Sequence, residues 1–291
     1  MPRLPNTRTA AYIFLLLNAA LWGISPPIIK NSFNYVSPTI FLLYRYLIAA
    51  IIFTPIFIKH KGATHQKTTP WLILSLALLS TPLTLYPLFE GLKLTTSIEG
   101  SLIESTSPLF TILGGLIFLH EIIKPKEWIG LGFAILGTLI LTTEPLISGN
   151  SATITSFSGN LLILASNLIW ASFLLLSKKT KVDSIKLTYF SFLISIPFFL
   201  SLALLEKQPL TLDTRALPGI LYMAIFGSII AFWAYQEGQK RIEASEAAVF
   251  SYLKPLFTLP LAVFWLMEPV RPLIIIGGLV TLIGVYISEK R

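Results

Sequence analysis

The sequence has no cysteine, which excludes disulfide bonds, thiolate chemistry and cysteine-ligated metal sites. Only 12% of its residues are charged, where a soluble domain carries about 25%. All aspartates and histidines lie between the apolar runs, and no G-x-x-x-x-G-K-[ST] phosphate loop is present. We therefore expect neither ATP hydrolysis nor catalysis within the apolar runs, and we expect no metal and no organic cofactor.

Apolar sequence dominates the chain instead. Hydrophobic residues make up 54% of the 291 residues, and the mean hydropathy is +0.75. A soluble core of this length could not bury so much apolar surface, so the composition predicts an all-α integral membrane protein. The net charge of +8 comes from Lys and Arg in short runs between apolar segments, which is typical of membrane topology. We expect a lipid bilayer around the protein and no nucleic-acid partner.

Ten apolar runs are candidates for transmembrane helices, since a span needs about 20 largely apolar residues. The first five are Tyr12–Ile29, Pro38–Ile58, Trp71–Leu92, Ser97–Leu119 and Trp128–Thr142. The last five are Gly159–Leu176, Ile185–Leu205, Leu217–Gln236, Ala244–Met267 and Pro272–Ser288. The fifth and tenth runs are short and need their flanking residues to cross a bilayer.

An internal repeat organises these runs. Residues 90–140 match residues 237–287 at a constant offset of 147, and Pro108–Thr111 recurs as Pro255–Thr258. The match predicts two homologous halves, residues 1–143 and 159–291, joined by a linker at 144–158. Five spans, an odd number, separate equivalent positions, so we expect two inverted five-helix repeats. Inverted repeats suit alternating access around a site at the membrane midplane.

The basic residues predict the orientation. Of the 22 Lys and Arg residues, fifteen fall on the side of the N-terminus, five on the opposite side, and two, Arg45 and Lys254, within spans. Because basic residues are enriched on the cytoplasmic side, we expect both termini in the cytoplasm, the linker outside, and a multi-pass protein of the cell membrane.

The two halves share further features: a Trp in the first and sixth spans, a Pro in the fourth and ninth spans each followed by a Glu at the helix end, and paired glycines. They are carried by Trp22, Trp170, Pro108, Glu121, Pro255, Glu268, Gly130, Gly137, Gly277 and Gly284. Together with the ten spans in two repeats, these features resemble the drug/metabolite transporter superfamily, and most closely its EamA-type ten-helix transporters. The resemblance implies a transporter of amino acids, other metabolites or drugs. Lys254 departs from the acidic or neutral residue often found before the second Pro, and this departure keeps an anionic substrate open.

Two ionisable residues deep inside apolar runs are the main candidates for a site. Glu104 lies in the fourth span and Lys254 in the ninth, which are equivalent spans of the two halves. Such groups cost several kcal/mol at this depth unless they are paired or hydrated, and by default they suggest function. A structural ion pair is the alternative. We favour function, because the equivalent positions, Ser251 and Ser107, show that the scaffold does not require the charges. Both serines are also candidate substrate-binding residues.

Other candidates are polar or aromatic. Arg45, in the second span, either extends its side chain toward the outer headgroups or serves in gating or carboxylate binding. The aromatic pairs near mid-helix are Trp22 with Trp170 and Tyr86 with Trp233; some of the four are expected to line a cavity. The duplicated residues at helix ends, Glu121 and Glu268, are expected to cap helices or to pair with Lys or Arg.

The sequence therefore predicts a secondary active transporter of small organic metabolites, with amino acids or related zwitterions as the expected substrates and a proton as a candidate coupling ion. An exchanger of anionic or nucleotide-type metabolites is the alternative. A membrane enzyme that uses Glu104 as a base is disfavoured, because the spans contain no His or Asp to accompany it.

Overall fold

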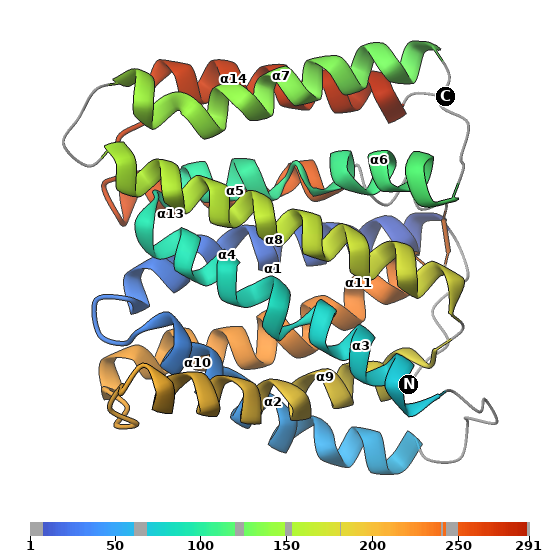
Figure 1. Ribbon diagram of the computed structural model, residues 1–291, viewed down its shortest axis with the longest axis vertical. Coiled ribbons are helices and arrows are strands. Elements are labelled where there is room, and N and C mark those ends of the chain that lie inside the picture. Colours follow the sequence, from blue (N-terminus) through green and yellow to red (C-terminus); the bar gives the residue numbers. More distant parts are fainter. Residues whose placement is uncertain are drawn as a thin grey trace.

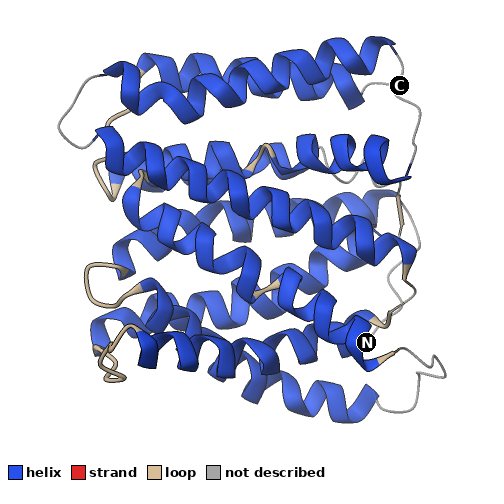
Figure 2. Cartoon of the chain, in the orientation of Figure 1, coloured by secondary structure: helices blue, strands red, loops and turns tan. Residues whose placement is uncertain are grey.

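The computed structural model describes residues 8–60, 69–119, 125–148, 153–180, 182–239, 241–242 and 250–289. Within these residues every regular element is helical, as the sequence predicts, and the long helices run side by side across the molecule (Figures 1 and 2). Aliphatic and aromatic side chains cover much of the outer surface, as expected of helices that face lipid.

Two spans of the first half, which are predicted from the sequence as continuous, are each divided into two helices. The helices α1 (Arg8–Ser32), α2 (Pro38–His60) and α7 (Pro125–Ser148) are continuous. The third span divides into α3 (Pro70–Ser80) and α4 (Pro82–Leu94), and the fourth into α5 (Ser97–Glu104) and α6 (Ser107–Leu119). Each break lies just before or beside a proline, which lacks the amide proton needed to continue an α-helix.

The second half shows the same division between continuous and irregular spans. Here α8 (Thr153–Lys179), α9 (Ser184–Leu205) and α14 (Pro272–Glu289) are continuous. The eighth span follows a short turn, η1 (Thr214–Ala216), and contains α10 (Leu217–Tyr222), a π-helical segment η2 (Met223–Ile230) and α11 (Ala231–Gln239). The ninth consists of a 3-10 turn, η3 (Phe250–Leu253), and α13 (Lys254–Phe264); its expected start at Ala244 lies outside the described residues.

The number of spans agrees with the expected ten. Eight helical stretches of the described chain are long and apolar enough to cross a membrane by length and composition. Two shorter apolar helices, Phe250–Phe264 and Pro272–Gly284, correspond to the ninth and tenth spans. The first turn of α1 and the last turn of α14 lie at one edge of the molecule, and the end of α7 and start of α8 lie at the opposite edge (Figure 1).

The final helices of the two halves, α7 and α14, pack against each other as a separate layer (Figure 1). Glycines make this contact close: a Cβ on Gly137 would clash with Thr281, and one on Gly284 would clash with the backbone of Ala134. The absence of a side chain at these two positions therefore allows the close contact between α7 and α14. By contrast, a Cβ on Gly132 would meet nothing within 4 Å.

Candidate functional site

A cavity of about 110 Å³ lies at the centre of the bundle and is lined by residues of both halves. Its walls come from α1, α2, α3, α4, α5, α6, α8, α9, α11, α13 and the π-helical segment η2. A single water needs about 10–15 Å³ of such space, so the cavity has room for several waters or a small metabolite. Most of the wall is apolar, with a few charged and hydroxyl groups among the aromatic and aliphatic side chains.

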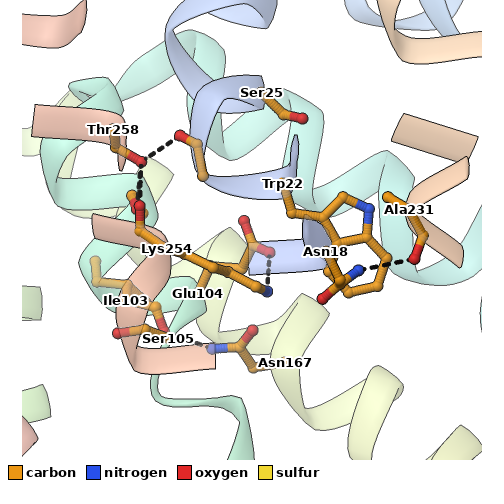
Figure 3. Close-up of polar contacts among 12 residues, drawn as sticks. Asn18, Trp22, Ser25, Ile103, Glu104, Ser105, Asn167, Ala231, Lys254 and Thr258 are labelled. Atoms are coloured by element: carbon orange, nitrogen blue, oxygen red, sulfur yellow. Dashed lines mark hydrogen bonds and ion pairs between the residues drawn. The ribbon is translucent and has the colours of Figure 1, made fainter. Parts of the chain in front are cut away.

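Glu104 and Lys254 form an ion pair at this cavity (Figure 3). Lys254 Nζ donates to Glu104 Oε1 at 2.9 Å, and the two side chains are 8% and 21% exposed. The ammonium group also lies 4.8 Å from the ring centroid of Trp22, within the range of a cation–π contact. Taking two charges out of water costs several kcal/mol per ion, so the pair contributes little net stability. It places a donor and an acceptor side by side in a mostly apolar chamber.

Helix breaks present both charges. Glu104 is the last residue of α5, and the chain leaves helical geometry before α6 begins. Asn167 on α8 bridges this break by donating from Nδ2 to Ile103 O at 2.7 Å and to Thr106 Oγ1 at 3.2 Å (Figure 3). A carbonyl freed at a break needs such a partner when water is excluded. The amide of Asn167 therefore fixes the end of α5 and with it the position of the carboxylate.

Lys254 is held by the close approach of α1 to the first turn of α13. A Cβ on Gly23 would lie 2.5 Å from the carbonyl oxygen of Lys254, so a larger residue could not occupy this position of α1. Thr258, one turn later, donates from Oγ1 to Gly23 O at 2.5 Å. The contact brings Trp22, the neighbour of Gly23, to the ammonium group.

An aromatic wall lies beside the ion pair. Phe232 contacts both Trp22 and Trp170, with ring centroids 6.0 and 6.1 Å apart. The indole Nε1 of Trp22 donates to Gly227 O at 3.0 Å, within the π-helical segment Met223–Ile230. Segments of π-helix are often found at functional sites, and here the segment forms part of the cavity wall.

Arg45 is a second cation of the cavity wall and is only 5% exposed. Its Nε donates to Ser228 Oγ at 2.8 Å, and its guanidinium carbon lies 5.2 and 5.6 Å from the ring centroids of Tyr46 and Phe89. Nη1 is buried without a partner, and no carboxylate of the described chain lies within ion-pair distance. Ring contacts supply roughly 1–2 kcal/mol, whereas burying a charge costs several, so the protein leaves this charge under-compensated. Of the two alternatives for Arg45, the one in which its side chain extends to the headgroups is contradicted, because the side chain turns inward and is buried.

The profile of the EamA-like transporter family matches the chain twice, over residues 9–143 and 157–289. The chain belongs to the EamA-like transporter family. Its resemblance to EamA-type transporters is thus confirmed, and the protein is a multi-pass membrane transporter with a small-molecule substrate and not an enzyme.

Individual relatives of this EamA-family transporter align over nearly its whole length. An uncharacterized transporter of Archaeoglobus fulgidus is 27% identical over 291 residues, which cover 98% of this chain and 99% of the relative. A Salmonella typhimurium protein named a probable amino-acid metabolite efflux pump is 27% identical over 286 residues, which cover 94% of this chain and 92% of that protein. A crystal structure with a TM-score of 0.71 covers 97% of this chain and 98% of its own at 18% identity, which shows a shared fold.

Six of the nine residues singled out in the sequence line the cavity of this EamA-family transporter. They are Glu104, Lys254, Trp22, Trp170, Ser107 and Arg45. Ser251 lies in the turn η3 and is not among the lining residues. Tyr86 and Trp233 are not either: Tyr86 donates to Glu206 Oε1 at 3.1 Å, and Trp233 is 47% exposed and packs edge-on against Phe14.

Several polar residues that contribute to the cavity were not predicted from the sequence. One is Asn167, which holds the break beside Glu104. Thr81, at the break between α3 and α4, lies 147 residues before Ser228, the partner of Arg45; both line the cavity. A hydroxyl residue beside a proline or glycine inside an apolar run is the sequence signal that could have identified Thr81 and Ser228.

Polar contacts within the first half and between the two halves join helix ends at one end of the bundle. Lys30, near the end of α1, donates to the carbonyls of Leu92 and Lys93 at 3.0 and 2.9 Å, where α4 ends. Glu268, after α13, accepts from the backbone amide of Ser97 at 2.8 Å and so caps α5. The structural role expected for Glu268 is confirmed, and Glu121 lies outside the described residues.

Proposed function

We propose that this transporter moves amino acids or related zwitterions across the cell membrane by alternating access, and that Glu104 and Lys254 bind the substrate. The observation that carries the proposal is the ion pair at the central cavity, to which each half contributes one charge. Breaking a buried ion pair leaves two uncompensated charges, which is strongly unfavourable. A zwitterion avoids this penalty, because its carboxylate pairs with Lys254 while its ammonium group pairs with Glu104.

The position of the cavity supports alternating access around it. A second cavity of about 30 Å³ shares Thr81, Phe192 and Phe232 with the central one. It lies toward the start of α9 and the end of α11, at the edge where α1 begins. Lys30 and Glu268 make their contacts at the other end. The present conformation therefore favours a route to the edge of the two termini, which we assign to the cytoplasm from the distribution of basic residues.

The relatives agree with an amino-acid substrate. Two of them, from Salmonella typhimurium and Escherichia coli, carry the name probable amino-acid metabolite efflux pump and align over 94% and 95% of this chain. The alternative, an exchanger of anionic metabolites, is favoured by the second cation, Arg45. A purely anionic substrate would pair with Lys254 and leave Glu104 without a partner, so Glu104 would need to bind a proton.

Uptake into proteoliposomes separates the two functions. If the pair binds a zwitterion, Lys254→Ala and Glu104→Gln each reduce uptake of a neutral amino-acid substrate at least 100-fold, because each removes one of the two charges that hold it. With an anion-only substrate, Lys254→Ala alone is inactive and Glu104→Gln retains uptake. The matched controls are Lys93→Ala, an exposed lysine, and Asp213→Asn, a loop carboxylate. Full uptake by Lys254→Ala would refute the site.

A further inference from the structure

The cavity holds one positive charge more than its ion pair accounts for. Glu104 and Lys254 neutralise each other at 2.9 Å, and Arg45 adds a third charge to the same wall. Arginine keeps its proton in proteins, so this third charge persists in the buried side chain. Among the described residues that line the cavity, Glu104 is the one carboxylate, and it is already paired.

Arg45 is held in place, but one of its N–H donors has no hydrogen-bond partner. Its Nε donates a hydrogen bond to Ser228 Oγ, and the rings of Tyr46 and Phe89 flank the guanidinium group. Nη1 has no partner and is buried. A buried donor on a charged group is expensive to leave unpaired, so this nitrogen points to a ligand group that the protein itself does not supply.

The two cations belong to one connected wall. Lys254 lies over the Trp22 ring, and Trp22 donates to the carbonyl of Gly227. The next residue, Ser228, accepts from Arg45. One π-helical segment thus links the indole that faces the first cation to the hydroxyl that orients the second, and a molecule bound at the ion pair has Arg45 on the same wall.

We infer that Arg45 is an oxyanion subsite, and that the substrate is an amino acid or related zwitterion with an additional acidic group. The inference rests on the proposed function, in which the ion pair binds the ammonium and carboxylate groups. A guanidinium group presents parallel N–H donors that match a carboxylate or a phosphate. A substrate of net charge −1 then neutralises the cavity completely, which a neutral zwitterion cannot do.

Binding to the full chain in lipid nanodiscs tests the subsite. Isothermal titration compares three matched probe pairs: L-glutamate with L-glutamine, L-aspartate with L-asparagine, and O-phospho-L-serine with L-serine. The wild type should bind the acidic member of at least one pair 10-fold or more tighter, and the pair that responds distinguishes a carboxylate from a phosphate ligand. If no acidic probe binds tighter than its neutral analogue, the inference is wrong.

Variants assign the preference to Arg45. In Arg45→Gln the ratio of the two affinities should fall to about one, whereas Arg215→Gln, an exposed arginine with a 68% exposed side chain, should keep it. Should Arg45→Gln fail to fold, Arg45→Lys retains the charge without the planar fork and should reduce the ratio by several-fold. An unchanged ratio in the folded variant overturns the assignment.

Lys254→Ala separates this inference from the proposed function. Both members of a probe pair share the α-amino and α-carboxylate groups, so the variant should weaken both equally and leave their ratio unchanged. If both affinities persist in Lys254→Ala while Arg45→Gln loses the ratio, the ion-pair function fails and the subsite stands. If Lys254→Ala abolishes binding of both members but Arg45→Gln keeps the ratio, the subsite fails and the function stands.

Discussion

The break between α5 and α6 and the turn that precedes α13 occupy equivalent positions, 147 residues apart, but they present different groups to the cavity. The first carries Glu104 on its near side and Ser107 on its far side. The second carries Ser251 and Lys254 at the matching positions. The carboxylate therefore comes from the residue before one break and the ammonium group from the residue after the other, and the two meet at 2.9 Å.

The difference separates what the scaffold requires from what the substrate requires. Each half tolerates Ser where the other half has a charge, so the breaks themselves need only small polar residues. The contact between α7 and α14 behaves in the opposite way. There both halves keep the same residue, with Gly137 and Gly284 each pressed against the other helix. Equivalent positions with the same residue in both halves serve helix packing, and equivalent positions with different residues form the candidate binding site.

The largest effect is expected from removing one charge at the breaks. Lys254→Ser introduces the residue that the first half carries at position 107, and it leaves Glu104 uncompensated. We expect loss of uptake and a fall of about 3 kcal/mol in the free energy of unfolding. Adding Glu104→Ser should restore most of the stability without restoring uptake.

Melting of the four members of this double-mutant cycle in nanodiscs measures the coupling between the two charges. The surface pair Asp213–Arg215, with one side chain 68% exposed, serves as the control and should show much weaker coupling. A double variant less stable than Lys254→Ser would contradict the interpretation that the charges serve the substrate.

A smaller effect, equal in both halves, is expected at the contact between α7 and α14. Gly137→Ala and Gly284→Ala each force a methyl group into the other helix and should destabilise by about 1–3 kcal/mol. Gly132→Ala, on the same helix but in open space, should be neutral or stabilising by about 0.5–1 kcal/mol. Thermal unfolding of the three variants checks this; clearly unequal costs for Gly137 and Gly284 would count against a symmetric contact.

Glu104, Lys254 and the number of spans could be predicted from the sequence, because apolar runs and the ionisable residues within them are visible without knowing any packing. The orientation of the aromatic residues could not. Tyr86 and Trp233 are equivalent by the offset of 147, and neither lines the cavity, whereas the residues before them, Leu85 and Phe232, both do. In a span that is apolar on all sides, the hydrophobic pattern does not say which of two neighbouring residues faces inward. Phe232 meets Trp22 and Trp170, and Trp233 is 47% exposed.

The orientation of the Arg45 side chain could not be predicted from the sequence either. Its sequence position allowed either an outward-reaching side chain or an internal one, since a long side chain in the outer half of a span can do both. What decides is Ser228, which lies 183 residues away and accepts the Nε hydrogen bond. Such a distant pair leaves no periodic signal in the sequence.

The smallest effects are expected at two asparagines of the first and sixth spans, Asn18 and Asn167. Both are buried, and both donate to a carbonyl beside an irregular helix: Asn18 to Ala231 O at 2.9 Å, and Asn167 to Ile103 O at 2.7 Å. Asn167 also reaches Thr106 Oγ1 at 3.2 Å. We expect Asn18→Ala to cost about 1 kcal/mol and Asn167→Ala about 2 kcal/mol, because each leaves a buried carbonyl without its donor.

The inequality between these two variants tests whether the halves differ in conformation as well as in charge. Ser158→Ala, an exposed residue of the same helix as Asn167, is the control and should change stability by less than about 0.5 kcal/mol. If the two breaks were held identically, Asn18 would bind near Phe250, the counterpart of Ile103, and the two asparagine variants would cost the same. Equal melting temperatures for Asn18→Ala and Asn167→Ala would therefore argue that the asymmetry of the two breaks lies in their charges alone.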